Sequence, residues 1–372
     1  MKKLTVGFMP LLDCAAIVAA VEQGFTVAEG LEVRLVRETS WANIRDRLIV
    51  GHFDAAHLLG PMAVASTLGV GHLRAPLIAP FSLGLGGNAI TASIALWDQM
   101  QREGASLGAG PRVQGKALAK VVEARARAAH EPLTFGMVYP FSCHNYELRY
   151  WLAATGIDPE RDVRLVVIPP PFLADAMRTG QIDGFCVGEP WSSVAVEAGV
   201  GNIVATTTSI WPLSPEKVIG CRAQWAEENA DTLDALIRAL YRAALWCEDP
   251  ANHADLAYML GAARYVGARA NLLHSALGNR LSLSAGAPPI SIPDFHFMAR
   301  HHATFPWVSH ALWFYAQMLR WRQIEEAVGD IDVVRSAYRP DIYRRALAPL
   351  NVDLPTADTK VERFFDEGLF VP

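Results

Sequence analysis

The sequence has few cysteines, and their positions match neither a zinc site nor a network of disulfide bonds. The five cysteines are odd in number, widely spaced, and include no Cys-x-x-Cys pair. This excludes the common structural zinc patterns. The spacing favours buried free thiols in a reducing compartment instead. The five cysteines are Cys14, Cys143, Cys186, Cys221 and Cys247.

Basic stripes, long apolar runs and low-complexity segments are also missing. Lys and Arg number 33 against 38 Asp and Glu, and the basic residues are scattered, so direct nucleic-acid binding is not expected. No uninterrupted apolar run is long enough to span a membrane. Instead, 51% hydrophobic and 19% charged residues over 372 positions indicate a soluble α/β protein of two domains.

The N-terminus leads directly into a strand-like segment. The first ten residues, MKKLTVGFMP, lack the apolar region and the cleavage site of a secretory signal. Residues 11–20 are apolar, but Pro10 and Asp13 interrupt the run. We therefore expect a cytoplasmic protein, with a leader removed from the chain as the alternative.

One pattern occurs twice. The segments GHFDAAHLLGP at 51–61 and GQIDGFCVGEP at 180–190 share Gly, Asp and Pro at the same offsets, and each follows an amphipathic run. A glycine after a helix, an aspartate opening a short strand and a proline entering the next helix predict the same three elements in each copy. The two copies suggest paired lobes that each direct a strand end and a helix N-terminus at the space between them.

Strand-like and helix-like segments alternate through two blocks of the chain. Such βαβ order predicts a largely parallel sheet in each block, with a ligand crevice beyond the carboxyl ends of the strands. The predicted strands are 4–8, 31–36 and 53–58 in the first block, and 133–138, 163–168, 185–187 and 203–207 in the second.

Two segments could carry the chain from one lobe to the other. Residues 81–93 are glycine-rich and then β-like, and residues 206–214 contain threonines followed by Trp-Pro. We therefore expect lobe one to comprise 1–88 and 212–372, including C-terminal helices that cap the cleft. Lobe two would be the insertion 89–211.

Three candidate binding residues fall near predicted helix starts or crossings. Trp41 follows a plausible N-cap at Ser40, where backbone N–H groups favour an anion, although packing into the lobe explains its position equally well. Asn88 could offer a carboxamide donor from the first crossing. Lys217 follows the second crossing, and its ammonium could point at the cleft, although a lysine in such a place is usually solvated.

The segment FSCHN at 141–145 opens a predicted helix at 146–155. Adjacent Cys143 and His144 invite a nucleophile hypothesis. No orienting carboxylate can be identified, so ligand contact by His144 or Asn145 is the favoured interpretation.

Gly188 and Glu189 end the second repeated segment. Gly188 would let a ligand approach the backbone closely, whereas Glu189 would face an arginine, a lysine or the other lobe. Trp191 is expected to pack as a helix anchor. His52 and His57 are expected to be surface residues with local hydrogen bonds rather than metal ligands. No catalytic residue, metal or cofactor is predicted.

The motifs together resemble the periplasmic nitrate- and bicarbonate-binding proteins of ABC importers and their cytoplasmic relative, the NasS nitrate/nitrite sensor. The resemblance implies a type II periplasmic-binding-protein fold, with two α/β lobes that are joined by two crossings and close over a small oxyanion. It implies a pocket containing Trp41, Gly188 and Lys217, to which we add Asn88, His144, Asn145 and Glu189 as ligand-binding candidates. The segments that carry it are 7–13, 40–46, 141–151, 180–191, 210–217 and 309–314.

The resemblance implies a non-catalytic cytoplasmic sensor of nitrate or nitrite. Such a sensor holds a NasT-type antiterminator protein and releases it when anion binding closes the lobes. The alternative is the substrate-binding protein of an ABC importer for nitrate, bicarbonate or another small anion. A third interpretation is an enzyme on the same fold, similar to pyrimidine synthases of the thiamine pathway, which would use Cys143 and His144.

Overall fold

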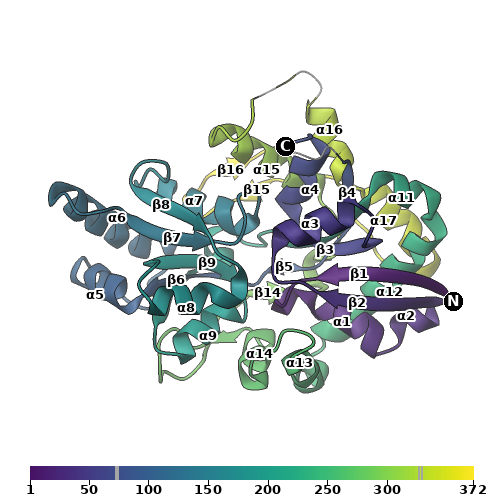
Figure 1. The fold of residues 1–372 in the computed structure, drawn as a ribbon, viewed down its shortest axis with the longest axis horizontal. Coiled ribbons are helices and arrows are strands. Elements are labelled where there is room, and N and C mark those ends of the chain that lie inside the picture. The colour runs from purple at the N-terminus through teal and green to yellow at the C-terminus, as the bar shows by residue number, and fades with distance from the viewer. Residues whose placement is uncertain (72–74, 326, 328–329) are drawn as a thin grey trace.

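Two α/β lobes, each built on a five-stranded sheet, make up the protein (Figure 1). The computed structural model describes residues 1–71, 75–325, 327 and 330–372. The first sheet has the order β2-β1-β3-β11-β4, in which β2, β1 and β3 are parallel and β11 is antiparallel to both of its neighbours. Its strands are β1 (Lys2–Phe8), β2 (Leu31–Arg37), β3 (Ala55–Leu59), β4 (Leu77–Ser82) and β11 (Lys217–Arg222).

The second sheet has the order β10-β6-β9-β7-β8. Strands β8, β7 and β9 are parallel, whereas β6 is antiparallel to both β9 and β10. The strands are β6 (Asn88–Ser93), β7 (Leu133–Met137), β8 (Val163–Val167), β9 (Gly184–Gly188) and β10 (Gly201–Thr206). Asn88 therefore belongs to the second sheet, although the predicted boundary left it in lobe one.

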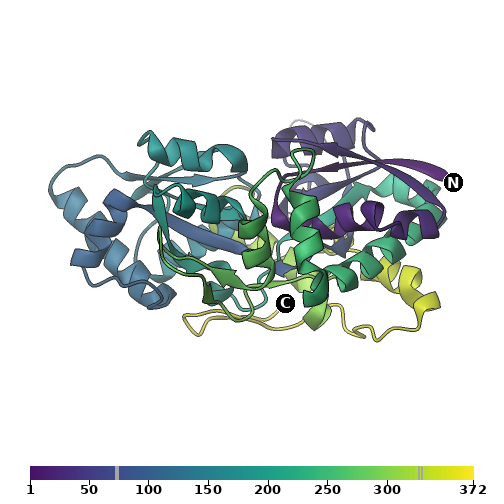
Figure 2. The same cartoon turned by 90° about the horizontal axis from the view of Figure 1, so that it is seen from below.

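Helices cover the faces of both sheets, and those of the C-terminal part pack mainly on lobe one (Figures 1 and 2). The first lobe carries α1 (Ala15–Glu22), α2 (Phe25–Ala28), α3 (Trp41–Ile49) and α4 (Gly60–Thr67). The second carries α5 (Ile94–Arg102), α6 (Pro111–Arg127), α7 (Cys143–Ala154), α8 (Leu173–Arg178), α9 (Trp191–Glu197) and α10 (Thr207–Ile210). The C-terminal helices are α11 (Ala223–Glu228), α12 (Ala230–Glu248), α13 (His253–Gly261), α14 (Ala270–Leu277), α15 (Val308–Arg320), α16 (Asp330–Ala337) and α17 (Pro340–Leu347).

The repeated Gly-x-x-Asp pattern has the same role in both lobes. Gly51 and Gly180 follow the ends of α3 and α8 with φ of 83° and 72°, a left-handed conformation that glycine adopts without steric cost. The strands that follow are β3 and β9, and the next helices are α4 and α9. The prediction of helix, strand and helix in each copy is therefore confirmed.

The repeated aspartates join neighbouring strands in the same way. The Asp54 carboxylate accepts the backbone N–H of Thr5 at 2.7 Å, and the Asp54 N–H donates to the Thr5 carbonyl at 2.9 Å. Asp183 and Thr134 form the matching pair, at 2.8 Å for both bonds. Each aspartate thus extends the parallel ladder beside the strand that it opens.

The chain passes between the lobes at 83–87 and again at 207–216, because β4 and β11 belong to one sheet and β6 and β10 to the other. In the first crossing, β5 (Leu85–Gly86) pairs with β14 (His296–Phe297). Gly86 has a φ of 71°, and a Cβ there would lie 2.3 Å from the Phe295 carbonyl oxygen. Glycine is therefore required at this point of the crossing.

A C-terminal hairpin links the lobes a further time, which the sequence did not indicate. It consists of β15 (Glu362–Arg363) and β16 (Leu369–Phe370). Phe365 donates its N–H to the Ile210 carbonyl at 2.8 Å, and the Tyr150 hydroxyl of α7 donates to Asp366 at 2.9 Å. Among the residues described, three short strand pairs lie outside the main sheets: β5 with β14, β15 with β16, and β12 (Arg280–Leu281) with β13 (Ile290–Ser291).

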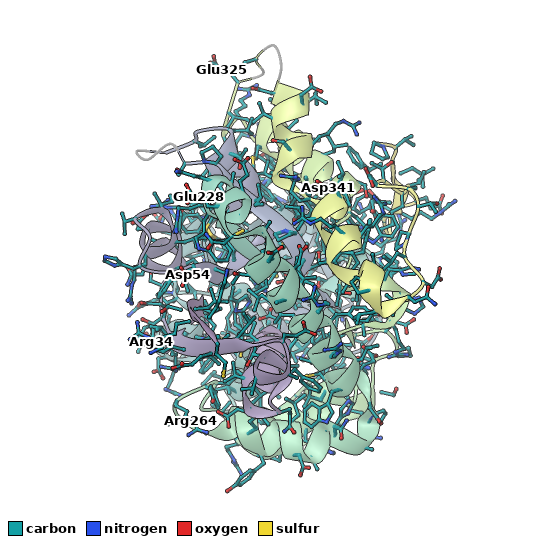
Figure 3. The ribbon with its side chains drawn as sticks, turned by 90° about the vertical axis from the view of Figure 1, so that its right-hand side faces the viewer. Arg34, Asp54, Glu228, Arg264, Glu325 and Asp341 are labelled. Carbon is teal, nitrogen blue, oxygen red and sulfur yellow. The ribbon has the colours of Figure 1, made fainter. Side chains whose placement is uncertain are left out.

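The outer end of lobe one carries charges of both signs, including Arg34, Asp54, Glu228 and Arg264 (Figure 3). Acidic and basic residues are scattered along the sequence, and this face accordingly carries both. Among the residues described, no helix combines the length and the apolar composition that crossing a bilayer would require.

Candidate functional site

The candidate site lies where the two sheets face each other, around the side chain of Lys217. Lys217 is the first residue of β11 in lobe one, and its side chain is 0% exposed. A buried ammonium needs charged or hydrogen-bonding partners, because desolvation is costly. Its Nζ lies 2.7 Å from Asp13 Oδ2 and 3.4 Å from His144 Nε2, and it forms a second ion pair with Glu216.

Asp13 is the counter-ion that lobe one contributes to Lys217. It lies in a single 3-10 turn (Leu12–Cys14) that follows β1, at the carboxyl end of the parallel strands. Burial by itself would raise the pKa of the Asp13 carboxyl, but Lys217 and His57 outweigh it and hold the pKa below the ordinary value. Asp13 is therefore ionised at neutral pH.

His57 is fully buried in β3, so the expectation of a surface histidine was wrong. Its Nδ1 accepts the backbone N–H of Met9 at 3.3 Å, and its Nε2 lies 3.1 Å from Asp13 Oδ1. The Met9 contact places the imidazole proton on Nε2, where it can be donated to Asp13. Burial lowers the pKa of His57, which favours this neutral form although Asp13 opposes the shift.

Trp41 lies in the first turn of α3, as predicted, and is 1% exposed. Its ring meets the ring of His57 edge-on, with 5.3 Å between centroids and 82° between planes. The indole Nε1 is buried, and no described residue accepts its hydrogen bond. A buried donor without a partner is uncommon in native proteins and needs an explanation.

Asn88 connects two buried carboxylates from separate elements. Its Nδ2 donates to Glu147 Oε2 of α7 at 3.1 Å and also to Glu216 Oε1 just before β11. Burial raises the pKa of Glu147 to about 7, against the opposing effects of the Asn88 hydrogen bond and of Lys217. Burial therefore favours the protonated form of Glu147.

Gly188 places backbone beside these side chains. It faces Asn88 in the β6–β9 ladder, and a Cβ at Gly188 would lie 3.1 Å from Asn88 Oδ1 and 3.6 Å from Lys217 Nζ. Glu189 donates its N–H to the Gly87 carbonyl at 2.9 Å. Because hydrogen bonding alternates along an antiparallel pair, the N–H of Gly188 points away from β6.

His144 comes from the first turn of α7 and is fully buried. Burial, and after it Lys217, lower the pKa of His144 well below the ordinary value, so its imidazole is neutral. Its Nδ1 has no hydrogen-bond partner among the residues described. Neighbouring Cys143 is also buried and contacts the Glu216 carbonyl at 3.2 Å. Burial and Glu147 raise the pKa of its thiol well above the ordinary value, so the structure offers no thiolate here.

Two predicted site residues point elsewhere. The Asn145 side chain donates to the Pro140 carbonyl at 2.7 Å and accepts from Arg149 at 2.9 Å, so it stabilises the start of α7. The Glu189 carboxylate accepts the backbone N–H of Ser193 at 3.3 Å, whereas an arginine, a lysine or the other lobe was predicted to face it. Burial raises its pKa to about 7.

We call the converging residues the Lys217 cluster. It includes five of the predicted candidates, and their role in ligand binding stays a prediction. Asp13, Glu147 and Glu216 lie in segments that carry the resemblance but were not predicted as site residues. Glu147 lies one helical turn after His144, and this spacing could have indicated it. The cluster consists of Asp13, Trp41, His57, Asn88, His144, Glu147, Gly188, Glu216 and Lys217.

The lobes are closed over the cluster. Leu12 donates its N–H to the Glu189 carbonyl at 2.7 Å, and Trp191 Nε1 donates to the Pro10 carbonyl at 2.9 Å. Trp191 therefore binds the opposite lobe besides anchoring its own helix. Further contacts between the lobes join Arg45 to Tyr139 and Arg269 to Glu197.

Metal binding is not indicated in the part of the chain that the structure describes, since no group of three His, Cys, Asp or Glu side chains there is arranged to hold an ion. The cluster instead joins one ammonium and three carboxylates to an indole N–H, neutral imidazoles and a carboxamide. Two lobes with a buried polar cluster between them have the architecture of a two-lobed binding protein.

Comparison with known proteins gives the family. The NMT1-like family model matches residues 1–261. The nitrate/nitrite binding protein NrtA of Synechococcus elongatus is 33% identical over 383 residues, which cover 100% of this chain and 84% of that protein. The crystal structure of periplasmic nitrate-binding NrtA from Synechocystis superposes with a TM-score of 0.91 at 27% identity, covering 100% of this chain and 95% of that one.

The chain belongs to the NMT1-like family, among the NrtA-like substrate-binding proteins. The predicted periplasmic-binding-protein-like α/β fold is confirmed. Another relative, the nitrate import ATP-binding protein NrtC of Synechocystis, is 33% identical over 371 residues, which cover 99% of this chain. The chain spans 53% of the length of NrtC.

Proposed function

We propose that this protein binds nitrate or nitrite between its lobes, without chemical conversion, as the substrate-binding component of an importer. The observation that carries the proposal is the buried ammonium of Lys217, surrounded by donors that lack partners within the protein. Trp41 Nε1 and His144 Nδ1 are both buried without a hydrogen-bond partner among the described residues. A ligand with several acceptor oxygens would satisfy such groups.

The donors of the cluster suit a small anion of single, diffuse charge. Nitrate needs one cation and several neutral donors, and Lys217, Trp41 and the backbone at Gly188 can supply them. Phosphate and carboxylate groups are typically held by the planar fork of an arginine, which the cluster does not contain. His144 adds a neutral imidazole rather than a second cation.

Closure of the lobes would sequester the ligand. The cluster draws Asp13 from lobe one and His144 from lobe two, so it is complete only when the lobes meet. The contacts from Leu12 to Glu189 and from Trp191 to Pro10 hold that arrangement. A ligand drives closure only to the extent that it binds the closed form more tightly than the open form.

The relatives support the proposed ligand and the importer role. NrtA of Synechococcus elongatus is a nitrate/nitrite binding protein, and NrtC is the ATP-binding protein of a nitrate importer. A non-catalytic role agrees with the buried Cys143, whose thiol pKa is too high for a nucleophile. The partners of this chain would then be the permease and ATPase subunits of an ABC importer.

Calorimetric titration with nitrate, nitrite and hydrogencarbonate in parallel tests the ligand. Nitrate or nitrite should bind with the lowest Kd, and Lys217→Gln should weaken binding at least tenfold, as expected for a lost hydrogen bond to a charged group. Lys120→Gln is the matched control, because Lys120 is exposed and lies 3.8 Å from Glu103 on lobe two. Tighter binding of hydrogencarbonate, or no binding of the three anions to the parent protein, would contradict the proposal.

The sensor role is a second proposal with the same pocket. It rests on the resemblance of the sequence segments to NasS-type sensors, and it requires a cytoplasmic location and a NasT-type antiterminator as partner. Purification of the protein from its native cells, with and without nitrate, distinguishes the two roles. An RNA-binding partner released by nitrate would establish the sensor, whereas permease subunits would establish the importer.

A further inference from the structure

The Lys217 cluster contains more carboxylates than a site for an anion would be expected to hold. Asp13, Glu147 and Glu216 surround one ammonium, and these residues are 7%, 1% and 3% exposed. With all three ionised, the cluster would carry a net charge of −2, since three negative charges face one positive charge. Bringing another anion into a buried site of that charge is unfavourable.

Glu216 is the direct competitor of an incoming anion. It pairs with Lys217, the same ammonium that the proposed ligand would need. Asn88 Nδ2 donates both to Glu216 and to Glu147, so one amide nitrogen brings the two carboxylates together. With Asp13 also beside Lys217, three buried carboxylates gather around one ammonium, and a proton on Glu147 would remove one of these negative charges.

Building on the proposed function, we infer that the site takes up its anion together with one proton, which is held by the Glu147 carboxyl group. The proton comes from solvent and binds a carboxylate oxygen of Glu147, so one anion and one proton enter together and the net charge is unchanged. Protonation of Glu147 removes one of the three negative charges around Lys217, which lowers the repulsion that the incoming anion meets.

The ionisation of Glu147 supports this step. Burial raises its pKa to about 7, against the effects of Asn88 and Lys217, so solvent at neutral pH can supply the proton. A carboxyl group with an ordinary pKa could not take up a proton at that pH without a large cost.

The other titratable groups around Glu147 cannot take up the proton in its place. Burial lowers the pKa of His57, His144 and His296, which keeps the imidazoles neutral. Burial raises the pKa of the Cys143 and Cys186 thiols and of the Tyr338 hydroxyl, which keeps these groups protonated. Asp13 stays ionised beside Lys217. The Glu189 carboxyl, whose pKa is also raised, is bonded to Ser193 outside the cluster.

The test counts protons directly. Nitrate is added to the unbuffered parent protein at pH 8 in a pH-stat, and Kd is measured by calorimetry from pH 6 to pH 8.5. We expect uptake approaching one proton per nitrate bound at pH 8. We also expect Kd to rise by up to about tenfold per pH unit above pH 7.

Two variants assign the proton. Glu147→Gln is permanently neutral, so it should lose most of the uptake and bind nitrate at pH 8 as tightly as the parent binds at pH 6. Glu189→Gln is the matched control and should keep the uptake, because its carboxyl faces Ser193.

Nitrate binding without proton uptake and with a constant Kd would overturn the inference and leave the proposed function intact. Uptake lost in Glu189→Gln but kept in Glu147→Gln would also overturn it. If nitrate, nitrite and hydrogencarbonate all fail to bind at every pH, both the proposed function and the inference are wrong. Proton uptake, the pH dependence of Kd and binding of the three anions are all measured on the parent protein. These outcomes therefore do not depend on whether a variant folds.

Discussion

Replacing Trp41 by phenylalanine separates the binding role of this residue from its packing role. The indole Nε1 is buried and has no partner among the residues described, whereas the ring packs edge-on against His57. Phenylalanine keeps an aromatic ring at this position and removes the N–H. Affinity and stability should therefore respond differently to the same substitution.

The magnitudes follow from the burial of Trp41. Removing an unsatisfied buried N–H gains about 1–3 kcal/mol, and the smaller ring loses a comparable amount through lost burial and a residual cavity. The free energy of unfolding without ligand should therefore change by no more than about 1 kcal/mol. A hydrogen bond to a charged ligand contributes about 1.5–3 kcal/mol, so Kd for nitrate should rise by roughly 10- to 150-fold.

Calorimetry with nitrate and urea unfolding without it measure the two quantities. Trp307→Phe is the matched control, because Trp307 is also buried with an unpartnered Nε1 among the residues described, but it lies outside the Lys217 cluster. It should show a similar change in stability and unaltered binding. A change of less than threefold in Kd for Trp41→Phe, or an equal loss in Trp307→Phe, would refute the assignment of Trp41 to the pocket.

Three further predictions concern neighbouring residues. The pKa of Glu189 is raised from 4.5 to about 7 in the folded protein. The folded state therefore binds the proton more tightly than the unfolded state, and this stabilisation is complete below pH 4.5. It is lost as the pH rises towards 7, because the carboxyl group then ionises in the buried site. Glu189→Gln should therefore stabilise the protein by up to about 3 kcal/mol more at pH 8 than at pH 5 in urea unfolding, and an equal effect at both pH values would contradict the raised pKa. Gly188→Ala would place a Cβ 3.1 Å from Asn88 Oδ1 and 3.6 Å from Lys217 Nζ, so calorimetry should show nitrate binding weakened about tenfold or more by crowding. Cys143→Ala should leave nitrate affinity within about threefold of the parent, and neither protein should turn over any candidate substrate. Turnover by the parent that is lost in Cys143→Ala would revive the enzyme interpretation.

Local sequence rules were sufficient for the elements of the fold. The repeated glycines at 51 and 180 predicted helix ends because a left-handed residue is needed there, and both have positive φ. The strand predicted at 31–36 corresponds to β2 (Leu31–Arg37), and the one at 163–168 to β8 (Val163–Val167). The predicted crossings, 81–93 and 206–214, were chosen because glycines in one and threonines followed by Trp-Pro in the other interrupt the βα pattern.

The same rules could not separate neighbouring candidates for the site. His144 and Asn145 are adjacent in sequence, yet only His144 contacts Lys217, whereas Asn145 bonds Pro140 and Arg149. Successive residues of a helix point in directions about 100° apart, so the placement of α7 against lobe one decides which of them faces the cluster.

The amino-acid sequence by itself determined the two βα blocks, the repeated Gly-x-x-Asp turns and the likeness to oxyanion-binding proteins. These features depend on backbone preferences and on periodicities that act over a few residues. The tertiary structure decided that Asp13, His57, Glu147 and Glu216 join Lys217, and it shifted the ionisation of the titratable groups around that lysine. Residues so far apart in the chain meet only through strand register and closure of the lobes, and burial there changes the cost of each charge.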